Sequence, residues 1–433
     1  MHQISNPPKN DWSKILERPT LSNHNTADIV ASIFDLVEKI GDKALKQFTE
    51  FYDSVSVDSF CVSEKTINDA EIFLANDLKK AILLAKSNIQ KFHDAQKTNK
   101  ISVETISGVQ CWQEKRAIQK VGLYIPGGTA PLFSTVLMLA IPAQIAGCSD
   151  IVLCTPPDKS GSINPAVLYA AKICGVTQIY TVGGIQAIAA MTLGTETIPK
   201  VYKIFGPGNQ YVTAAKQYAT QLGVAIDMPA GPSELMVVAD DSANAAFVAA
   251  DLLSQAEHGT DSQVILVSNS QSILNAVSSE IKTQIESLPR RHIAKQSIKN
   301  SKLLLIENDE MILEIINEYA PEHLIICMKN EDYFLDHIQN AGSIFIGNYT
   351  PESAGDYASG TNHTLPTNGF ARNYSGVNLD SFLKTISFQK ISKQGIQNIG
   401  KAVEIMADAE GLQGHSNAIS VRLQYLEQND AIK

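Results

Sequence analysis

The sequence contains no hydrophobic run long enough to cross a membrane as a helix, which requires about 20 consecutive apolar residues. Its most apolar stretch, residues 136–147, is short and is interrupted by Pro142 and Gln144. The start of the chain contains neither a basic nor an apolar segment, so we expect no secretory signal. A membrane is therefore not an expected partner, and we expect a cytoplasmic protein.

Cysteine and positive charge are both scarce. The six cysteines are scattered singly, without a C-x-x-C pair, which is typical of reduced thiols in the cytosol and not of a disulfide framework. There are 35 Lys and Arg residues against 45 Asp and Glu residues, which gives a formal net charge of −10. Basic residues are not clustered beyond pairs such as Arg290–Arg291. Because a phosphate backbone is bound by clustered positive charge, we expect no nucleic-acid partner.

Two nucleotide-binding motifs are incomplete. The dinucleotide fingerprint G-x-G-x-x-G is absent, because Gly206 and Gly208 supply only its first half and Tyr211 stands at the third glycine position. Segment 395–402 has the glycine and lysine spacing of a phosphate loop. However, Ala402 offers no hydroxyl to magnesium, and no apolar strand leads into Gly395. Neither motif predicts a nucleotide site.

The 433 residues do contain a regular alternation of strands and helices, at a length that favours two or three domains. Helical periodicity runs through residues 26–51 and 67–93. Strands are expected at 121–125, 151–154, 178–182, 201–205, 235–238, 263–267, 302–306, 323–327 and 343–346, with helices between them. This alternation predicts parallel sheets with helices on both faces, in two doubly wound modules. After about residue 367 the pattern is helical again.

Glycine and proline are concentrated where the expected strands end, at 126–128, 183–184, 206–208 and 229–232. In open α/β sheets the carboxyl ends of the strands form the ligand crevice, so these loops are the expected location of a site.

Several polar residues could form that site. Gln255 and His258 stand three apart in the last turn of an expected helix, 243–258, and so share one face. Glu322 and His323 are adjacent, just before an apolar strand, where regular strand geometry would point them to opposite faces unless the backbone kinks. Each group also has an ordinary interpretation, as a polar helix end or a solvated loop.

Two further groups lie later in the chain. Segment 351–363 combines small residues with Glu352, Asp356 and His363, which suits either a surface loop or a loop folded over a ligand. Glu410 and His415 flank two glycines near the end of the chain, where His415 could be a simple surface histidine. Gln255, His258, Asp356 and His415 would together give a nitrogen and oxygen ligand set that zinc accepts, although no close-spaced metal motif is present.

A set of motifs resembles the histidinol dehydrogenase family. They occupy residues 124–132, 182–187, 204–209, 227–234, 254–259, 321–324 and 352–363, in the family's order. The resemblance covers roughly residues 20–425. It implies oxidation of L-histidinol to L-histidine through L-histidinaldehyde with two NAD molecules, the last step of histidine biosynthesis. It also implies a homodimer with one Zn²⁺ per subunit.

The resemblance carries roles to particular residues. It implies Gln255, His258, Asp356 and His415 as zinc ligands, and Glu322 and His323 as the catalytic acid–base pair. Substrate contacts are implied for Ser233, Gln255, His258, His323, Asp356, Glu410 and His415, with Glu410 and His415 reaching the site of the partner subunit. NAD contacts are implied for Tyr124, Gln186 and Asn209.

The family's fold has two incomplete Rossmann-like, aldehyde-dehydrogenase-like modules with helical extensions at both termini. We therefore expect an N-terminal extension at 1–20 and a first, discontinuous module at 21–120 and 234–372 that holds the zinc and acid–base residues. We expect an inserted NAD-binding module at 121–233 and a helical dimerisation tail at 373–433.

Two other functions remain open. An aldehyde dehydrogenase with a thiol nucleophile would need a cysteine in an exposed, electropositive loop, with Cys111 and Cys148 as the residues to test. A catalytically silent zinc-binding scaffold would retain the ligands without the chemistry.

Overall fold

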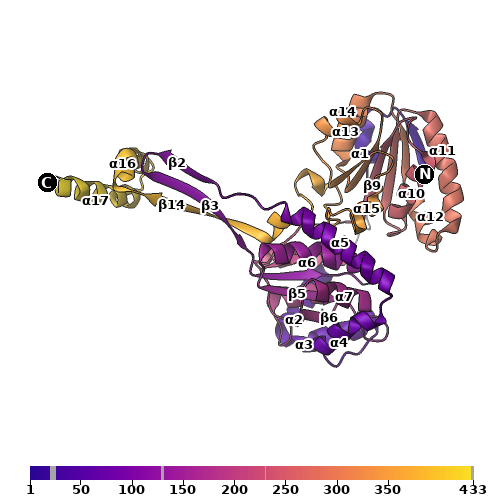
Figure 1. Ribbon diagram of the computed structural model, residues 1–433, viewed down its shortest axis with the longest axis horizontal. Coiled ribbons are helices and arrows are strands. Elements are labelled where there is room, and N and C mark those ends of the chain that lie inside the picture. Colours follow the sequence, from indigo (N-terminus) through magenta and orange to yellow (C-terminus); the bar gives the residue numbers. More distant parts are fainter. Residues whose placement is uncertain (20–25, 128–130, 230, 431–433) are drawn as a thin grey trace. The chain divides into compact units, whose positions relative to one another are not determined.

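The computed structural model describes residues 1–19, 26–127, 131–229 and 231–430 (Figure 1). It forms two compact units, the first made of Met1–Gln96 and Ile118–Phe382 and the second of Lys97–Ala117 and Leu383–Lys433. Parts of two glycine-rich motifs, residues 128–130 and 230, lie outside the described residues. None of the described helices is both long and apolar enough to span a membrane.

The first sheet of unit 1 has five parallel strands in the order β6-β5-β4-β7-β8. Helices cover both of its faces, which explains why its strands are continuous apolar runs. The strands are β4 (Lys120–Tyr124), β5 (Asp150–Thr155), β6 (Gln178–Thr181), β7 (Lys203–Phe205) and β8 (Ala225–Ile226), and the helices are α6 (Phe133–Ala146), α7 (Pro165–Ile173), α8 (Gly184–Leu193) and α9 (Gln210–Gln221). The strand order reverses between β4 and β7, where a doubly wound sheet binds its ligand.

The second sheet of unit 1 is also parallel, in the order β1-β11-β10-β9-β12-β13. Its strands are β1 (His2–Ser5), β9 (Glu234–Ala239), β10 (Gln263–Ser268), β11 (Lys302–Leu305), β12 (His323–Cys327) and β13 (Ser343–Ile346). The helices are α1 (Trp12–Ile15), α10 (Ala245–Ala256), α11 (Gln271–Gln284), α12 (Arg291–Lys299), α13 (Asp309–Tyr319), α14 (Glu331–His337) and α15 (Glu352–Tyr357). Apart from β1, its strands follow the same winding as the first sheet. The expected α/β class with two doubly wound modules is confirmed.

The N-terminal helices pack differently from our expectation for residues 21–120. They are α2 (Thr26–Ile40), α3 (Asp42–Asp53), α4 (Glu64–Asp69) and α5 (Asn76–Asp94). Helix α2 packs on α8 and α9, and α5 packs on α6, so this segment covers the sheet of 120–226 and not that of 234–346. The reason is the apolar stripe of α2, whose Ile33, Phe34 and Val37 are buried in the same core cluster as Val152 of β5.

The first twenty residues are not a separate extension. Strand β1 pairs in parallel with β11, and Trp12 and Leu16 are buried against the second sheet. The sequence pattern of 2–5 is too short to reveal this pairing.

Unit 2 is an antiparallel sheet with two helices. Its strands are β2 (Ser102–Ile106), β3 (Val109–Ala117) and β14 (Leu383–Ile391), in the order β14-β3-β2, and its helices are α16 (Lys393–Ala409) and α17 (Gln413–Asp430). The expectation of an entirely helical tail at 373–433 is wrong at residues 383–391, which pair with β3. The phosphate-loop spacing at 395–402 lies within α16, as its helical periodicity indicates.

Candidate active site

A cleft of about 520 Å³ in unit 1 collects most of the polar residues that the sequence singled out. The loops that follow β4 and β7 contribute Gly127 and Asn209. The module of the second sheet contributes Ser233, His258, Glu322, His323, Asp356 and His363. Ser233, Glu322 and His323 stand at the amino ends of β9 and β12. The expectation that strand carboxyl ends form the crevice therefore holds for the first sheet and is wrong for the second.

Helix α10 positions Gln255 and His258. It begins at the Asn244 cap, whose side chain accepts hydrogen bonds from the N–H groups of Ala246 (3.0 Å) and Phe247 (3.3 Å). Gln255 is completely buried in its last turn, and His258 follows the helix end and opens into the cleft.

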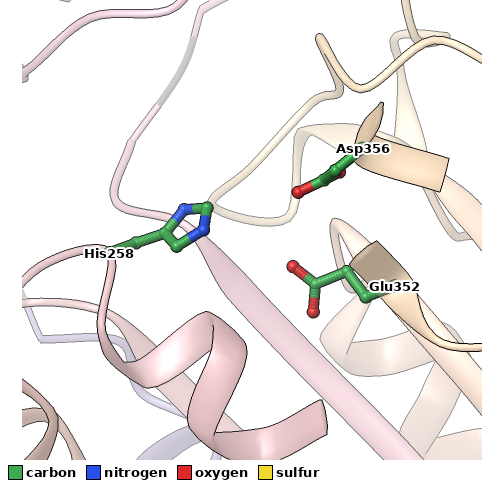
Figure 2. Close-up of side chains that lie close together, drawn as sticks. All are labelled: His258, Glu352 and Asp356. Atoms are coloured by element: carbon green, nitrogen blue, oxygen red, sulfur yellow. The ribbon is translucent and has the colours of Figure 1, made fainter. Parts of the chain in front are cut away.

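Helix α15 supplies two carboxylates one turn apart. Glu352 is its first residue, and Asp356 lies four residues later on the same face. Ligand atoms of His258, Glu352 and Asp356 all lie within 4.8 Å of one another, and we call these three residues the donor cluster. Figure 2 shows the imidazole of His258 facing the two carboxylates.

Gln255 is tied to the donor cluster through Glu352. With its amide oriented to suit its neighbours, the Gln255 nitrogen donates to both carboxylate oxygens of Glu352, one of them at 3.2 Å. This interaction engages the amide nitrogen and leaves the amide oxygen as the atom available to a metal ion. Glu352 is 1 % exposed and was not among the expected ligands.

His323 lies at the centre of the acidic groups. Its Nδ1 is 3.6 Å from Glu322 Oε2 and 3.9 Å from Glu352 Oε1, and its Nε2 is 3.5 Å from Asp356 Oδ1. The carboxylate of Glu322 is held in turn by the backbone N–H of Glu234, which donates to its Oε2 at 3.0 Å. Glu322 and His323 both line the cleft, Glu322 directly before β12 and His323 as its first residue.

The electrostatics of His323 follow from this crowding. Burial alone would lower the pKa of its imidazole, but the carboxylates of Glu352 and Glu322 outweigh burial and hold the pKa well above its ordinary value. Burial likewise raises the pKa of the Glu352 carboxyl well above its usual range, against the opposing effect of His323.

The donor set suits a zinc ion. Both ring nitrogens of His323 and Oδ1 of Asp356 are buried without a hydrogen-bond partner among the described residues. Buried polar atoms normally have partners, so these atoms indicate that the site is completed by a group from outside the chain. Imidazole nitrogen and carboxylate oxygen are donors that zinc accepts.

His363, whose role the sequence left undecided, also lines the cleft. Its Nδ1 donates to the backbone carbonyl of Asp356 at 2.8 Å, and its Nε2 lies 3.1 Å from the hydroxyl of Thr135 on α6. It therefore fixes the end of α15 against the first module.

Two proposed site residues belong to unit 2. Glu410 follows α16 and His415 lies in the first turn of α17, and both side chains are exposed.

A second cavity, of about 710 Å³, is lined by the three residues expected to contact NAD. The Tyr124 hydroxyl accepts a hydrogen bond from the Gly184 N–H at 3.1 Å, and the Asn209 side chain caps α9. Gln186 is 1 % exposed. Because Gly127 and Asn209 line both cavities, this cavity adjoins the cleft.

A buried ion pair that the sequence did not reveal holds the loop between these cavities. Lys216 Nζ lies 2.5 Å from Asp227 Oδ1 and donates to the Gly206 carbonyl at 2.8 Å. Asp227 accepts from the Gly206 N–H at 2.8 Å. Gly206 has φ +129°, and a Cβ there would lie 2.1 Å from the Tyr124 carbonyl, so only glycine fits.

The thiol alternative is not supported. No cysteine is among the described residues that line the cleft, and burial raises the pKa of the Cys148 thiol to about 12. A thiol with such a pKa is a poor nucleophile.

Comparison with known proteins gives consistent matches. The family profile described as histidinol dehydrogenase matches residues 16–423. The chain is 56% identical to the histidinol dehydrogenase of Bacteroides thetaiotaomicron, over 99% of this chain and 100% of that protein. It is 50% identical to that of Colwellia psychrerythraea, over 94% and 95%. The crystal structure of histidinol dehydrogenase from Elizabethkingia anophelis matches with a TM-score of 0.96 and 55% identity, over 99% of both chains.

Proposed function

The chain belongs to the histidinol dehydrogenase family, and on that premise we propose that it oxidises L-histidinol to L-histidine by way of L-histidinaldehyde, with two NAD molecules. This reaction closes histidine biosynthesis. The observation that carries the proposal is one cleft in which Glu322 and His323 meet the donor cluster, beside the cavity lined by Tyr124 and Asn209. The six unpaired cysteines support a cytoplasmic location, because thiols stay reduced there.

We propose that Gln255, His258 and Asp356 hold a Zn²⁺ ion together with His415 from the tail of a partner subunit. When bound, zinc would ligate the imidazole and amino nitrogens of the substrate and so fix the carbinol carbon in place. Glu352 would orient the Gln255 amide through the contact described above. Ser233, at the start of β9, and Glu410 of the partner subunit would contact the substrate.

His323 is the proposed base of the first oxidation. It removes the hydroxyl proton of histidinol while NAD accepts hydride from the same carbon, giving the aldehyde, NADH and one proton. The carboxylates of Glu352 and Glu322 that hold its pKa above the ordinary value make the unprotonated imidazole a stronger base than a free one. Its buried place between three carboxylates favours the protonated product of this step.

Glu322 is the proposed base of the second oxidation. It takes a proton from a water molecule as the water adds to the aldehyde carbon, while protonated His323 returns its proton to the carbonyl oxygen, giving the hydrate and an unprotonated imidazole. His323 then takes the proton of one hydrate hydroxyl while a second NAD accepts hydride, leaving the carboxylic acid, which ionises. Both steps take place in one site, which helps to retain the reactive aldehyde.

We propose that the chain works as a homodimer. Unit 2 exposes several large apolar side chains, including Ile405, Met406, Leu412 and Val421. An apolar surface of this kind is typical of a partner interface.

The test is NADH formation, followed by absorbance, after L-histidinol is added to the zinc-loaded protein. We expect two NADH per histidinol, loss of activity after chelation, and recovery when zinc is restored. A zinc-loaded protein that forms no NADH would be the silent scaffold instead. Loss of activity on replacing both Cys111 and Cys148 would restore the thiol mechanism.

A further inference from the structure

The 710 Å³ cavity contains a carboxylate that the proposed reaction does not use. Asp53 is the last residue of α3, followed by Ser54 in the left-handed conformation, with φ 57°. It lines the cavity with Tyr124 and Gln186, and it does not line the catalytic cleft. Its Oδ2 is buried and has no hydrogen-bond partner among the described residues.

An unpaired buried acceptor is costly, so a donor from a bound molecule would stabilise it. Burial raises the pKa of the Asp53 carboxyl above its ordinary value, in agreement with the missing partner.

The cavity has two other charged lining residues, Asp158 and Lys159, and neither is an unpaired acid like Asp53. Asp158 is occupied within its own turn, where its Oδ1 accepts from the N–H groups of Ser160 (2.8 Å) and Ser162 (3.0 Å) and from the Ser160 hydroxyl (2.6 Å). Lys159 is the single cation among the described lining residues, and they include no arginine. A cavity of this composition has little to offer an additional phosphate group.

The location of Asp53 indicates which part of a dinucleotide it meets. Gly127 and Asn209 line both the cleft and this cavity, so the reacting nicotinamide belongs at their end. Asp53 lies outside the cleft, so it should face the part of the dinucleotide away from the nicotinamide, which includes the adenosine. The paired hydroxyls of a ribose are the donors there that match a carboxylate.

We propose that Asp53 accepts hydrogen bonds from the hydroxyls of the adenosine ribose and thereby selects NAD over NADP. The inference rests on the proposed function, because it takes the cavity as the cofactor site. A 2′-phosphate would remove one donor and bring negative charge against a buried carboxylate.

The experiment is titration calorimetry of NAD and of NADP binding to the full-length protein without histidinol. We expect the dissociation constant of the wild-type protein for NADP to be about 100-fold higher than that for NAD. In Asp53→Asn we expect that ratio to fall by about 10- to 100-fold, the value of a hydrogen bond to a charged group. Wild-type protein that binds both dinucleotides equally would overturn the proposal without any variant.

Asp158→Asn is the matched control, because it removes the same charge from the same cavity. We expect it to change the ratio less than about twofold, since its carboxylate is occupied within the turn. An unchanged ratio in Asp53→Asn, or an equal fall in Asp158→Asn, would contradict the specific role of Asp53. The histidinol-dependent NADH assay separates this result from the proposed function: NADH formation without discrimination refutes the inference alone, and discrimination without histidinol oxidation refutes the function alone.

Discussion

Glu322 and His323 are neighbours in the sequence, but their side chains differ in hydrogen bonding. Glu322 is anchored by the backbone N–H of Glu234, whereas neither ring nitrogen of His323 has a hydrogen bond among the described residues. An anchored carboxylate suits the positioning of one water, and an unanchored imidazole can exchange protons with successive substrates. The two residues should therefore act at different steps.

We predict that Glu322→Gln slows the second hydride transfer by about 100-fold and the first by less than tenfold, because only the second needs an activated water. His323→Asn should slow both by about 100- to 10,000-fold. Single-turnover absorbance of each NADH, started from histidinol or from histidinaldehyde, measures the two steps. Equal losses in both variants would contradict this division, and the zinc content of each variant is the control.

Asp251, one turn before Gln255 on α10, provides a test by pH. Burial raises the pKa of its carboxyl to about 7, against an ordinary value of 3.8. The folded state thus prefers the protonated acid, so this group favours folding most below pH 4 and opposes it increasingly between pH 4 and 7. We predict that Asp251→Asn matches the wild type near pH 4 and is more stable above pH 7, by up to about 4 kcal/mol. Denaturant unfolding across pH checks this, and a difference that is constant with pH would refute it.

At the scale of elements, the loop after β7 depends on the Lys216–Asp227 pair, whose side chains are 2% and 0% exposed. Both residues bond the backbone of Gly206, so the pair sets the loop that carries Asn209. Removing one partner leaves a buried charge without compensation.

We predict that Lys216→Met lowers the free energy of unfolding by about 3–5 kcal/mol, the usual effect of breaking a buried ion pair. Lys200→Met, at an exposed lysine of the same module, should change it by less than about 0.5 kcal/mol. Urea unfolding of both variants makes the comparison. A similar loss of unfolding free energy in the two would show that the ion pair adds no stability beyond that of an exposed lysine.

The sequence predicted individual elements better than their assembly. The apolar runs of β4, β5 and β9 are visible without a structure because parallel strands are buried on both faces. Strand β14 was missed because its partner, β3, lies far away in the chain and periodicity carries no information on pairing. The packing of α2 on α8 and α9 was missed for the same reason: an apolar stripe indicates burial but not the surface that covers it.

For the donor cluster, too, the sequence indicated neighbours along a helix but not which helices meet. Gln255 and His258 could be paired by their helical spacing, and Glu352 and Asp356 could have been paired by theirs. That α10 and α15 meet in space depends on the second sheet, which residue spacing does not reveal. Glu352 was singled out with its segment but not expected in the donor cluster, because a segment rich in small polar residues resembles a surface loop.

At the scale of the whole molecule, the proposed zinc site draws on residues of both units. Gln255, His258 and Asp356 belong to unit 1, and His415 belongs to unit 2. If unit 2 completes the site of the partner, an inactive subunit of one kind can complement an inactive subunit of another.

We predict that His323→Asn and His415→Asn, each inactive alone, regain about a quarter of wild-type activity when co-expressed in equal amounts, because half of the dimers are mixed and each has one intact site. NADH formation by the mixture measures the recovery, and light scattering confirms that dimers are present. No recovery would mean that each tail serves its own subunit.

The residues that line the 710 Å³ cavity all belong to the chain between Ile29 and Tyr211, whereas the donor cluster lies between His258 and Asp356. The proposed dinucleotide and metal sites thus lie on separate stretches of one polypeptide, which meet at the loops of Gly127 and Asn209. Without its metal, the protein should keep its affinity for the dinucleotide and lose affinity for L-histidinol. Returning one ion to each site should then restore activity without refolding.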